Sequence, residues 1–305
     1  MKILVTGGGG FLGSNLVNRL TTIGANVVVL DLAGGSKCDS NRQVQWIEGD
    51  FANPNVIDSA LRGIDIVYHL AWTTIPATSN KNPEFDVSSN LIGSIRLFDA
   101  CVRNDIKKVV FSSTGGTVYG DATTGLITET SPTNPQCSYG ITKLAVEKYL
   151  GLFAHLNKLN YVVLRVSNAY GPHQDPKSRV GFIGAALTAA VKQQVLDIWG
   201  DGQIIRDYVF VDDIIDAMVL ASAPDFANGV YHVSSGIGLK LNELVSILTV
   251  VSGLPIQVNY GPGRGFDVKR VVLDNSKLCA MGWSPKKDIN DGIRRTLKWM
   301  MANGG

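Results

Sequence analysis

Six short runs rich in β-branched and other apolar residues lie between residues 2 and 167 of this 305-residue chain, and stretches with helical spacing separate them. Strands that are apolar along their whole length are typical of a parallel sheet covered on both faces, because neither face meets water. Parallel neighbours need long crossover connections, and these are usually helices. The pattern therefore predicts an α/β fold built on a doubly wound parallel sheet. The strands are predicted at 2–6, 26–32, 44–51, 64–72, 107–114 and 161–167, and the clearest helices at 11–24 and 83–104.

The second half of the chain is less regular. Residues 204–221 are expected to form a strand that leads directly into a helix, and 289–302 a terminal amphipathic helix. We predict two domains: a first domain of residues 1–167 with a returning segment at about 207–228, and a smaller α/β domain made of 168–206 and 229–305.

Charge and cysteine usage exclude several classes of protein. The formal net charge is only +2, which gives no broad basic surface for nucleic acid. No apolar run is long enough to span a bilayer, and no signal peptide is evident. The cysteines form no CxxC pair, so we expect reduced thiols, no metal site and a cytoplasmic protein. They are Cys38, Cys101, Cys137 and Cys279.

The stretch TGGGGFLG places three glycines at regular spacing between the first predicted strand and the first predicted helix. Gly7 allows a tight turn, Gly10 lets the backbone approach a pyrophosphate, and Gly13 lets the helix pack closely on the strand. The spacing is G-x-x-G-x-x-G, and its position after a strand gives it meaning. The alternative is a glycine-rich turn that binds nothing.

Two acidic residues strengthen the prediction of a Rossmann-type dinucleotide site. Asp31 ends the second predicted strand, where a carboxylate would hold the adenosine ribose hydroxyls and repel a 2′-phosphate. This favours NAD over NADP, although Lys37 lies nearby in the sequence. Asp50 follows the third strand and could accept a hydrogen bond from the adenine, or it could cap a helix.

Tyr139 has a lysine four residues later, in SYGITKLAVEKYL. On a helix this spacing places Tyr139 and Lys143 on one face. A nearby ammonium favours the phenolate and lowers the pKa of a tyrosine, which would make Tyr139 a general base. The stretch 111–120, FSSTGGTVYG, supplies hydroxyls at the end of the fifth strand, either as part of this site or as an ordinary turn.

Six stretches together resemble one family. TGGGGFLG, SSTGGTVYG, YGITK, LRVSNAYGP, IIRDYVFVDD and GRGFDV occur in the order typical of the extended short-chain dehydrogenase/reductase family, and more narrowly of its NAD-dependent epimerase/dehydratase branch. The resemblance covers nearly the whole chain. It implies NAD as cofactor, a nucleotide sugar as substrate, and a homodimer formed through a four-helix bundle of 83–104 and the helix that contains Tyr139.

The resemblance also implies roles for individual residues. Tyr139 is the expected base, Lys143 its partner, and Thr114 the bridging hydroxyl, with Ser113 and Thr117 left open as alternatives. The expected cofactor-binding residues are Gly7, Gly10, Phe11, Leu12, Gly13, Asp31, Asp50, Phe51, Ala71, Asn90, Tyr139 and Lys143. The expected substrate-binding residues are Thr114, Asn168, Arg206, Arg264 and Asp267, although Arg206 could instead pair with Asp207 or Asp212 on the surface.

The expected reaction follows from what is missing after Thr114. Dehydratases and decarboxylases of this family carry acidic residues there, whereas this chain has Gly115 and Gly116. The resemblance therefore implies a UDP-hexose 4-epimerase that works through a transient 4-keto sugar. A 4-keto-sugar reductase, another nucleotide-sugar epimerase and a non-catalytic NAD-binding regulator are the alternatives. Val271 is either a gate that admits an N-acetyl group or a core strand residue.

Overall fold

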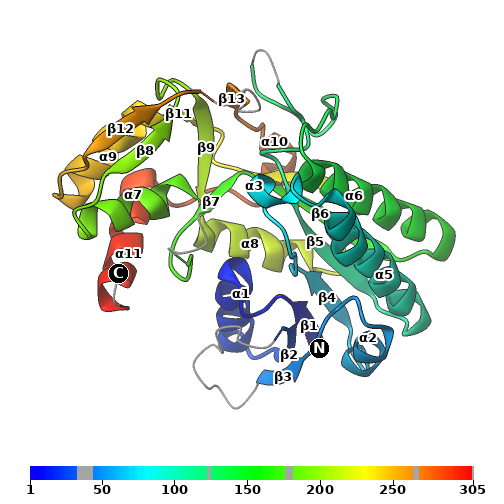
Figure 1. Ribbon diagram of the computed structural model, residues 1–305. Coiled ribbons are helices and arrows are strands. Elements are labelled where there is room, and N and C mark those ends of the chain that lie inside the picture. Colours follow the sequence, from blue (N-terminus) through cyan, green and yellow to red (C-terminus); the bar gives the residue numbers. More distant parts are fainter. Residues whose placement is uncertain (33–43, 122–124, 176–180, 264–267, 304–305) are drawn as a thin grey trace. The chain divides into compact units, whose positions relative to one another are not determined.

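The computed structural model describes residues 1–32, 44–121, 125–175, 181–263 and 268–303 (Figure 1). The chain divides into two compact units. The first contains Met1–Val118, Pro135–Arg165 and Ile215–Tyr231, and the second contains Tyr119–Asn134, Val166–Ile214 and His232–Gly305.

The sheet that dominates the first unit has seven strands in the order β10-β6-β5-β4-β1-β2-β3. The four pairings that join β1 to β5 within it are all parallel. This confirms the predicted Rossmann-type fold, with β10 as a strand that the sequence analysis did not include. The bounds are β1 Lys2–Thr6, β2 Asn26–Asp31, β3 Val44–Glu48, β4 Ile66–His69, β5 Lys108–Thr114, β6 Asn160–Val166 and β10 Gly229–Val233.

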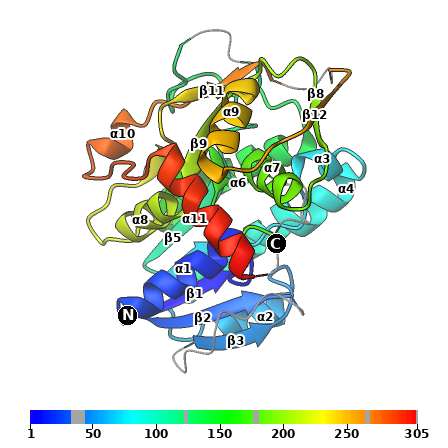
Figure 2. The ribbon, with the colours of Figure 1, turned by 90° about the vertical axis from the view of Figure 1, so that its left-hand side faces the viewer.

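Helices cover both faces of this sheet. On one face, α1 (Phe11–Thr22) and α8 (Val211–Ala221) lie side by side (Figures 1 and 2), and Arg19 of α1 forms an ion pair of 3.1 Å with Asp216 of α8. On the other face lie α2 (Pro54–Ala60), α5 (Gly93–Arg103) and α6 (Ser138–Asn157) (Figure 1). The buried strands between them carry the core, as the continuous apolar runs require.

The helix predicted over 83–104 is interrupted. It consists of α4 (Pro83–Asp86), a π-helical segment η1 (Val87–Ile92) and α5. The Ser94 hydroxyl of α5 donates to the carbonyl of Asn90 in η1 at 2.6 Å. Such wide turns are often found at functional sites. A short helix, α3 (Pro76–Ser79), precedes the segment.

The second unit is built around β9 (Ile205–Phe210). This strand pairs in parallel with β7 (Asn168–Tyr170) and β13 (Arg270–Val271), and antiparallel with β11 (Gly238–Lys240). The terminal helix is found as predicted, as α11 (Ile289–Ala302). The remaining elements are α7 Phe182–Val191, β8 Leu196–Trp199, α9 Leu241–Ser252, β12 Val258–Gly261 and α10 Ser276–Cys279, with β8 parallel to β12.

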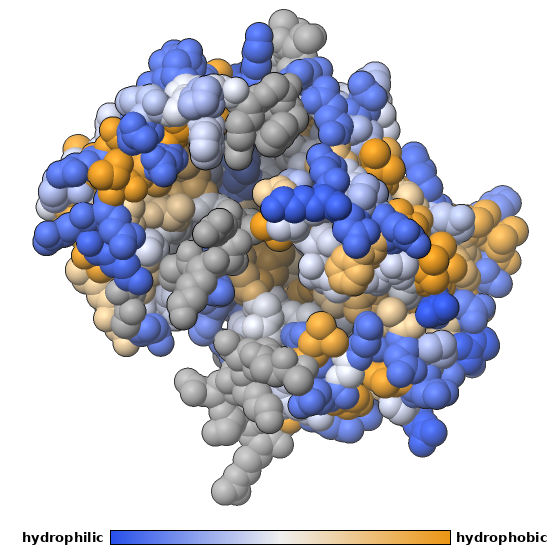
Figure 3. All heavy atoms as spheres, in the orientation of Figure 1, coloured by the Kyte–Doolittle hydropathy of each residue, from blue (hydrophilic) through white to orange (hydrophobic). Residues whose placement is uncertain are grey.

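Exposed apolar side chains gather on one flank of the first unit. Figure 3 shows orange side chains on the flank that α6 forms in the view of Figure 1. The exposed apolar residues of α4, η1 and α6 are Phe85, Val87, Ile92, Ile141, Tyr149, Leu152 and Leu156, and we call them the apolar flank. None of the helices in the described ranges is both long and apolar enough to cross a membrane.

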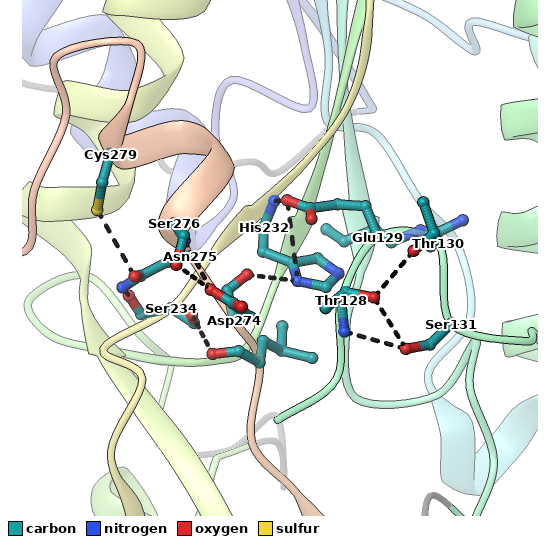
Figure 4. A network of polar contacts seen from close by, with 12 residues as sticks. Thr128, Glu129, Thr130, Ser131, His232, Ser234, Asp274, Asn275, Ser276 and Cys279 are labelled. Atoms are coloured by element: carbon teal, nitrogen blue, oxygen red, sulfur yellow. Dashed lines mark hydrogen bonds and ion pairs between the residues drawn. The ribbon is translucent and has the colours of Figure 1, made fainter. Parts of the chain in front are cut away.

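A polar network ties the segment Tyr119–Asn134 to the second unit, although the predicted domains placed this segment in the first (Figure 4). The fully buried His232 donates its backbone N–H to Glu129 at 2.9 Å, and its Nδ1 lies 2.8 Å from the carbonyl of Asp274. Because a carbonyl only accepts, Nδ1 carries the proton and Nε2 accepts from the Tyr119 hydroxyl at 2.5 Å. Figure 4 also shows Cys279 with its thiol on Asn275.

Candidate functional site

The glycine loop after β1 has the geometry that a phosphate group requires. Gly7 has φ of +73°, and a Cβ there would lie 2.7 Å from the backbone nitrogen of Ala71. A Cβ on Gly13 would lie 2.0 Å from the Gly7 oxygen, so α1 can pack here only with glycine. Gly10 begins α1 without any side-chain cap, and the first turn, which includes Phe11 and Leu12, holds no acidic residue. The positive end of the helix is therefore left for an anion.

Asp31 lies at the end of β2 next to this loop. Its Oδ2 accepts the backbone N–H of Gly9 at 2.7 Å, and its Oδ1 accepts from Leu32 at 2.8 Å. Asp31 therefore holds the glycine loop in place in addition to its predicted role toward a ribose. Asp50 is exposed, and its Oδ1 accepts from Ala52 at 2.8 Å. Lys37 lies outside the described residues.

The end of β4 lies beside the end of β1, where the strand order reverses. Ligands of doubly wound sheets bind at this kind of switch point. Ala71 is placed there by its contact with Gly7. Phe51 is buried, with its ring edge on His69 at a centroid distance of 5.1 Å. Its side chain belongs to the core, so any contact of Phe51 with a cofactor has to come from its backbone.

Asn90 is fully buried in η1. Its Oδ1 accepts the backbone N–H of Thr73 at 2.9 Å, and its Nδ2 donates to Asp86 at 2.9 Å. The amide therefore fixes the loop that follows Ala71. A direct contact of Asn90 with the cofactor stays a prediction, and its visible role is to shape the loop.

Tyr139 and Lys143 lie in the first turns of α6. The neighbouring segment caps this helix: the Tyr139 N–H donates to Ser79 Oγ at 3.0 Å and the Ser138 N–H to Asn80 Oδ1 at 2.8 Å. A Cβ on Gly140 would lie 2.8 Å from the Thr117 oxygen. Glycine after Tyr139 therefore lets the hydroxyl-bearing loop pack directly on the helix.

Asp86 of α4 binds the same turns of α6 through hydrogen bonds. This fully buried carboxylate accepts hydrogen bonds from four side chains of the first unit. The donors and distances are Thr74 Oγ1 at 2.5 Å, Ser138 Oγ at 2.7 Å, Thr142 Oγ1 at 2.8 Å and Asn90 Nδ2 at 2.9 Å. Asp86 was not predicted from the sequence, because an isolated acid in a helical stretch is more often exposed.

The three candidate hydroxyls differ in their partners. The Ser113 hydroxyl donates to Glu147, one helical turn beyond Lys143. Glu147 is buried and also accepts both Nε and Nη2 of Arg165, the shortest distance being 2.6 Å. Thr114 is only partly buried and accepts from Thr117 at 3.3 Å. Ser113 is therefore held by a buried ion pair, and Thr114 retains accessible surface.

Burial changes the acid–base properties of the α6 pair. Burial raises the pKa of Tyr139, with smaller contributions in the same direction from Cys137 and Asp86. The expectation that Lys143 lowers the pKa of Tyr139 is therefore not met in this structure, where burial raises that pKa. Burial lowers the pKa of Lys143 to about 7, while Glu147 and Asp86 oppose that shift.

An aromatic cage surrounds the Lys143 ammonium. Its Nζ lies 3.7 Å from the ring centroid of Trp72, 4.8 Å from that of Phe111 and 5.8 Å from that of Tyr139. The ammonium also donates to the Ser112 carbonyl at 2.8 Å. The sequence analysis missed Trp72, because nothing in the spacing links it to a lysine 71 positions later.

In the second unit, Asn168 and Arg206 lie on the adjacent strands β7 and β9. Asn168 Nδ2 donates to the Asp207 carbonyl at 2.9 Å, and Arg206 Nη1 donates to the Ile205 carbonyl at 2.9 Å. Asp212, one of the alternative partners of Arg206, lies 3.5 Å from Arg295.

The other predicted substrate residues fall in two groups. Val271 is a buried core residue of β13 opposite Arg206, which favours the second of its two readings. Arg264 and Asp267 lie outside the described residues.

In the described ranges, no three His, Cys, Asp or Glu side chains are grouped so that they could hold a metal ion. Cys101, Cys137 and Cys279 are free thiols, and Cys38 lies outside those ranges.

Comparison with known proteins identifies the relatives of this chain. The model of the NAD dependent epimerase/dehydratase family matches residues 3–234. A putative UDP-glucose 4-epimerase of Methanocaldococcus jannaschii is 34% identical over 303 residues and covers 99% of both chains. The solved UDP-glucose 4-epimerase of Thermotoga maritima with UDP-glucose has a TM-score of 0.95 at 34% identity, with 100% of both chains covered.

Two further solved structures are similar over almost the whole chain. The UDP-glucose 4-epimerase of Thermus thermophilus in complex with NAD has a TM-score of 0.93 at 33% identity, with 99% of both chains covered. The UDP-N-acetylglucosamine 4-epimerase of Methanobrevibacter ruminantium, in complex with UDP-N-acetylmuramic acid, has a TM-score of 0.93 at 32% identity, covering 99% of this chain and 98% of the other.

Proposed function

The chain belongs to the NAD dependent epimerase/dehydratase family, and we propose that it is an NAD-dependent nucleotide-sugar 4-epimerase that acts on UDP-hexoses. The observation that carries the reaction type is local. Tyr139 and Lys143 share one face of α6, while the positions after Thr114 are Gly115 and Gly116, with no acid to move protons elsewhere on the sugar. The chemistry is therefore confined to one carbon.

The residues of the first unit fit NAD. The uncapped N-terminus of α1 suits a pyrophosphate, and a Cβ on Gly10 would meet only the Gly7 oxygen, at 3.3 Å, so this side of the loop is open to a close approach. Asp31 is oriented by Gly9 next to this loop and suits ribose hydroxyls. Lys143 and Tyr139 would hold the nicotinamide ribose.

The mechanism follows from these groups. When bound, NAD supplies a reversible oxidation of the sugar at C4 and a positively charged ring that favours the phenolate. Tyr139 accepts the proton of the C4 hydroxyl and later returns it, while the Lys143 ammonium stabilises the phenolate. The sugar passes through a 4-keto form, and its reduction on the other face gives the epimer. No net redox change occurs.

Thr114 rather than Ser113 is proposed as the bridging hydroxyl. The Ser113 hydroxyl is engaged by Glu147, whereas Thr114 is partly accessible at the end of β5. Asn168, Arg206, Arg264 and Asp267 are proposed to bind the nucleotide diphosphate and ribose, because the planar donor fork of arginine matches phosphate oxygens.

The test is an assay of the purified protein without added cofactor. UDP-glucose, UDP-galactose and their N-acetyl forms are supplied separately, and products are separated by chromatography. We expect interconversion at C4 that falls by about 10²–10⁴-fold in Tyr139→Phe. Tyr149→Phe, an exposed tyrosine on the same helix, is the matched control.

The outcomes of this assay separate the alternatives. Conversion of none of the four sugars, with NAD bound, excludes the UDP-hexose 4-epimerase. Stoichiometric consumption of NAD(P)H with a 4-keto sugar would instead identify a reductase. The buried Val271 gives no support to an N-acetyl gate, so the assay decides between the two sugar classes.

A homodimer through a four-helix bundle is also proposed. Its support is the apolar flank, seven exposed apolar side chains along α4, η1 and α6. Contiguous exposed apolar surface of this kind is typical of an interface, and a two-fold axis would place the flank against its own copy. Sedimentation should show a dimer that Leu152→Arg dissociates and that Val250→Arg, an exposed position on α9, leaves intact. A monomer in the parent protein would contradict this.

A cytoplasmic location is proposed as well. The support is chemical: Cys101, Cys137 and Cys279 are unpaired thiols, which are typical of a reducing compartment. Fractionation of the source cells tests it, since recovery in an extracytoplasmic fraction would contradict it.

A further inference from the structure

The aromatic cage of Lys143 contains one residue without an assigned role. Trp72 follows β4, and its ring face lies closest to the ammonium, at 3.7 Å. All three cage rings lie within the ~6 Å over which an aromatic face attracts a cation. The rings of Trp72 and Tyr139 also form a T-shaped pair, with the centroids 5.9 Å apart and the planes at 75°. Trp72 therefore touches both members of the proposed reactive pair.

We propose that Trp72 is a positioning residue for the epimerisation: its indole face holds the Lys143 ammonium in its charged form beside Tyr139. The inference rests on the proposed function, because it assigns Lys143 the role of stabilising the phenolate. It adds a residue to that site, whose direct chemistry remains with Tyr139, Lys143 and Thr114.

The indole is placed for its face and not for its N–H. Trp72 Nε1 is buried and has no hydrogen-bond partner in the described part of the chain. A buried, unsatisfied donor opposes folding, and a phenylalanine would avoid that penalty. The contact with Lys143 therefore depends on the ring face, which a phenylalanine would also present, and not on the N–H.

The charged groups around Lys143 stabilise its ammonium only in part. Glu147 on α6 and Asp86 on α4 favour the ammonium, but Glu147 is shared with Arg165 and Asp86 with four hydrogen-bond donors. His69, on β4, stays uncharged because burial lowers its pKa to about 3.

Burial of Lys143 itself acts against its charge. An aromatic face attracts the ammonium without adding a second charge that would have to be desolvated. Loss of the Trp72 ring should therefore lower the pKa of Lys143 further.

Two substitutions separate the ring face from simple packing. Trp72→Phe keeps an aromatic face and removes the N–H, and Trp72→Leu fills space without one. Trp46→Leu, a partly buried tryptophan of β3, is the matched control. The pH dependence of kcat is measured for all four proteins with the UDP-hexose that the parent converts.

We expect kcat to fall as Lys143 loses its proton. In Trp72→Leu this fall should lie about half a pH unit or more below that of the parent, with a KM changed less than twofold. Trp72→Phe should stay within about 0.3 unit of the parent. A Trp72→Leu profile that superimposes on the parent, or equal shifts in both variants, overturns the proposal.

A second measurement does not depend on the activity. Since a lower pKa in the folded state makes protonation of Lys143 more costly on folding, the stability deficit of Trp72→Leu relative to Trp72→Phe should be largest near pH 6 and shrink toward pH 9. A deficit that does not change with pH means packing alone and overturns the proposal. If the parent converts no UDP-hexose, the proposed function fails, and this comparison still reports on the contact.

Discussion

Asp86 in the first unit and Asp207 in the second are both fully buried and gather several hydrogen bonds, but they differ in their donors. Asp86 of the first unit is held by side chains alone, three hydroxyls and an amide. Asp207 of the second unit is held mainly by backbone N–H groups. They belong to Ser235 at 2.9 Å, Gly236 at 3.1 Å and Leu273 at 3.4 Å, and the hydroxyls of Ser235 and Ser167 add to them.

The difference is one of adaptability. A hydroxyl can rotate and become an acceptor, whereas a backbone N–H can only donate. Asp86 therefore holds side chains around the reactive turns of α6, and a change in its charge can be accommodated by its neighbours. Asp207 determines the path of the chain at residues 235–236 and 273, and its neighbours cannot adjust.

The largest expected effect is that of Asp207→Asn. The amide would direct hydrogens at backbone donors, so buried N–H groups would lose their acceptor at a cost of about 3 kcal/mol. Urea unfolding followed by circular dichroism measures it, with faster hydrogen exchange expected at 235–236 and 273. Asp197→Asn, at an exposed position of β8, should cost less than about 0.5 kcal/mol. If Asp207→Asn is as stable as Asp197→Asn, the backbone donors do not need the Asp207 carboxylate, and the contrast between Asp207 and Asp86 disappears.

Lys143, next to Asp86 in the first unit, and Asp207 in the second unit should change the stability with pH in opposite directions. The folded-state pKa of Lys143 is lowered from 10.5 to about 7, so folding releases a proton between these values and stability rises with pH there. Burial raises the pKa of Asp207, so its contribution falls as pH rises above 3.8.

The parent protein should gain about 2 kcal/mol over Lys143→Met between pH 7 and pH 9. Urea unfolding at a series of pH values measures this gain. Lys148→Met, which removes an exposed lysine of the same helix, should run parallel to the parent. A pH-independent gap between the parent and Lys143→Met would show that Lys143 is charged throughout.

Asp86→Asn should impair the reaction more than the fold. The hydroxyls of Ser138 and Thr142 can accept from the new amide, so stability should fall by about 1 kcal/mol. The charge that favours the Lys143 ammonium is lost, and we expect kcat to fall about tenfold. Steady-state kinetics of the epimerase assay measures this. A stability loss as large as that of Asp207→Asn, with kcat unchanged, would reverse the contrast.

The smallest changes in stability should come from removing a single hydrogen-bond donor from Asp86 or from Asp207. Thr142→Val and Ser167→Ala each delete a single hydroxyl that donates to Asp86 or to Asp207. Since each carboxylate keeps its other donors, we expect a loss of about 1 kcal/mol or less in both. Thermal unfolding of the two variants side by side is sufficient. A markedly larger loss in either would mean that its carboxylate depends on one donor.

The sheet of the first unit was predictable because each of its first six strands carries its signal locally. Residues 27–30, for example, form a continuous apolar run, and β2 lies there. The seventh strand, β10, was missed because His232 interrupts its apolar pattern. The ring is buried only through partners such as Tyr119, 113 positions away. The short strands of the second unit pair across similar separations, which no local pattern reveals.

The residues of the candidate site also divide into those with a local sequence signal and those that depend on distant contacts. The glycine loop and the Tyr139–Lys143 pair depend on spacings of three and four residues, and the sequence contains them directly. Asp86 and Trp72 depend on contacts between segments more than 50 positions apart, 52 for Ser138 and Asp86. The hydrogen bond that distinguishes Ser113 from Thr114 joins Ser113 to Glu147, 34 positions away. Such roles become visible only once the chain has folded.

The π-helical turn at Val87–Ile92 sets a limit on the length of the chain. Successive residues of an α-helix are about 100° apart around its axis. Loss of one residue from this turn would rotate α4 by that angle relative to α5, and Asp86 would leave Ser138 and Thr142. The side chain of Ser88 is exposed and can be exchanged, whereas the number of residues in the turn cannot change.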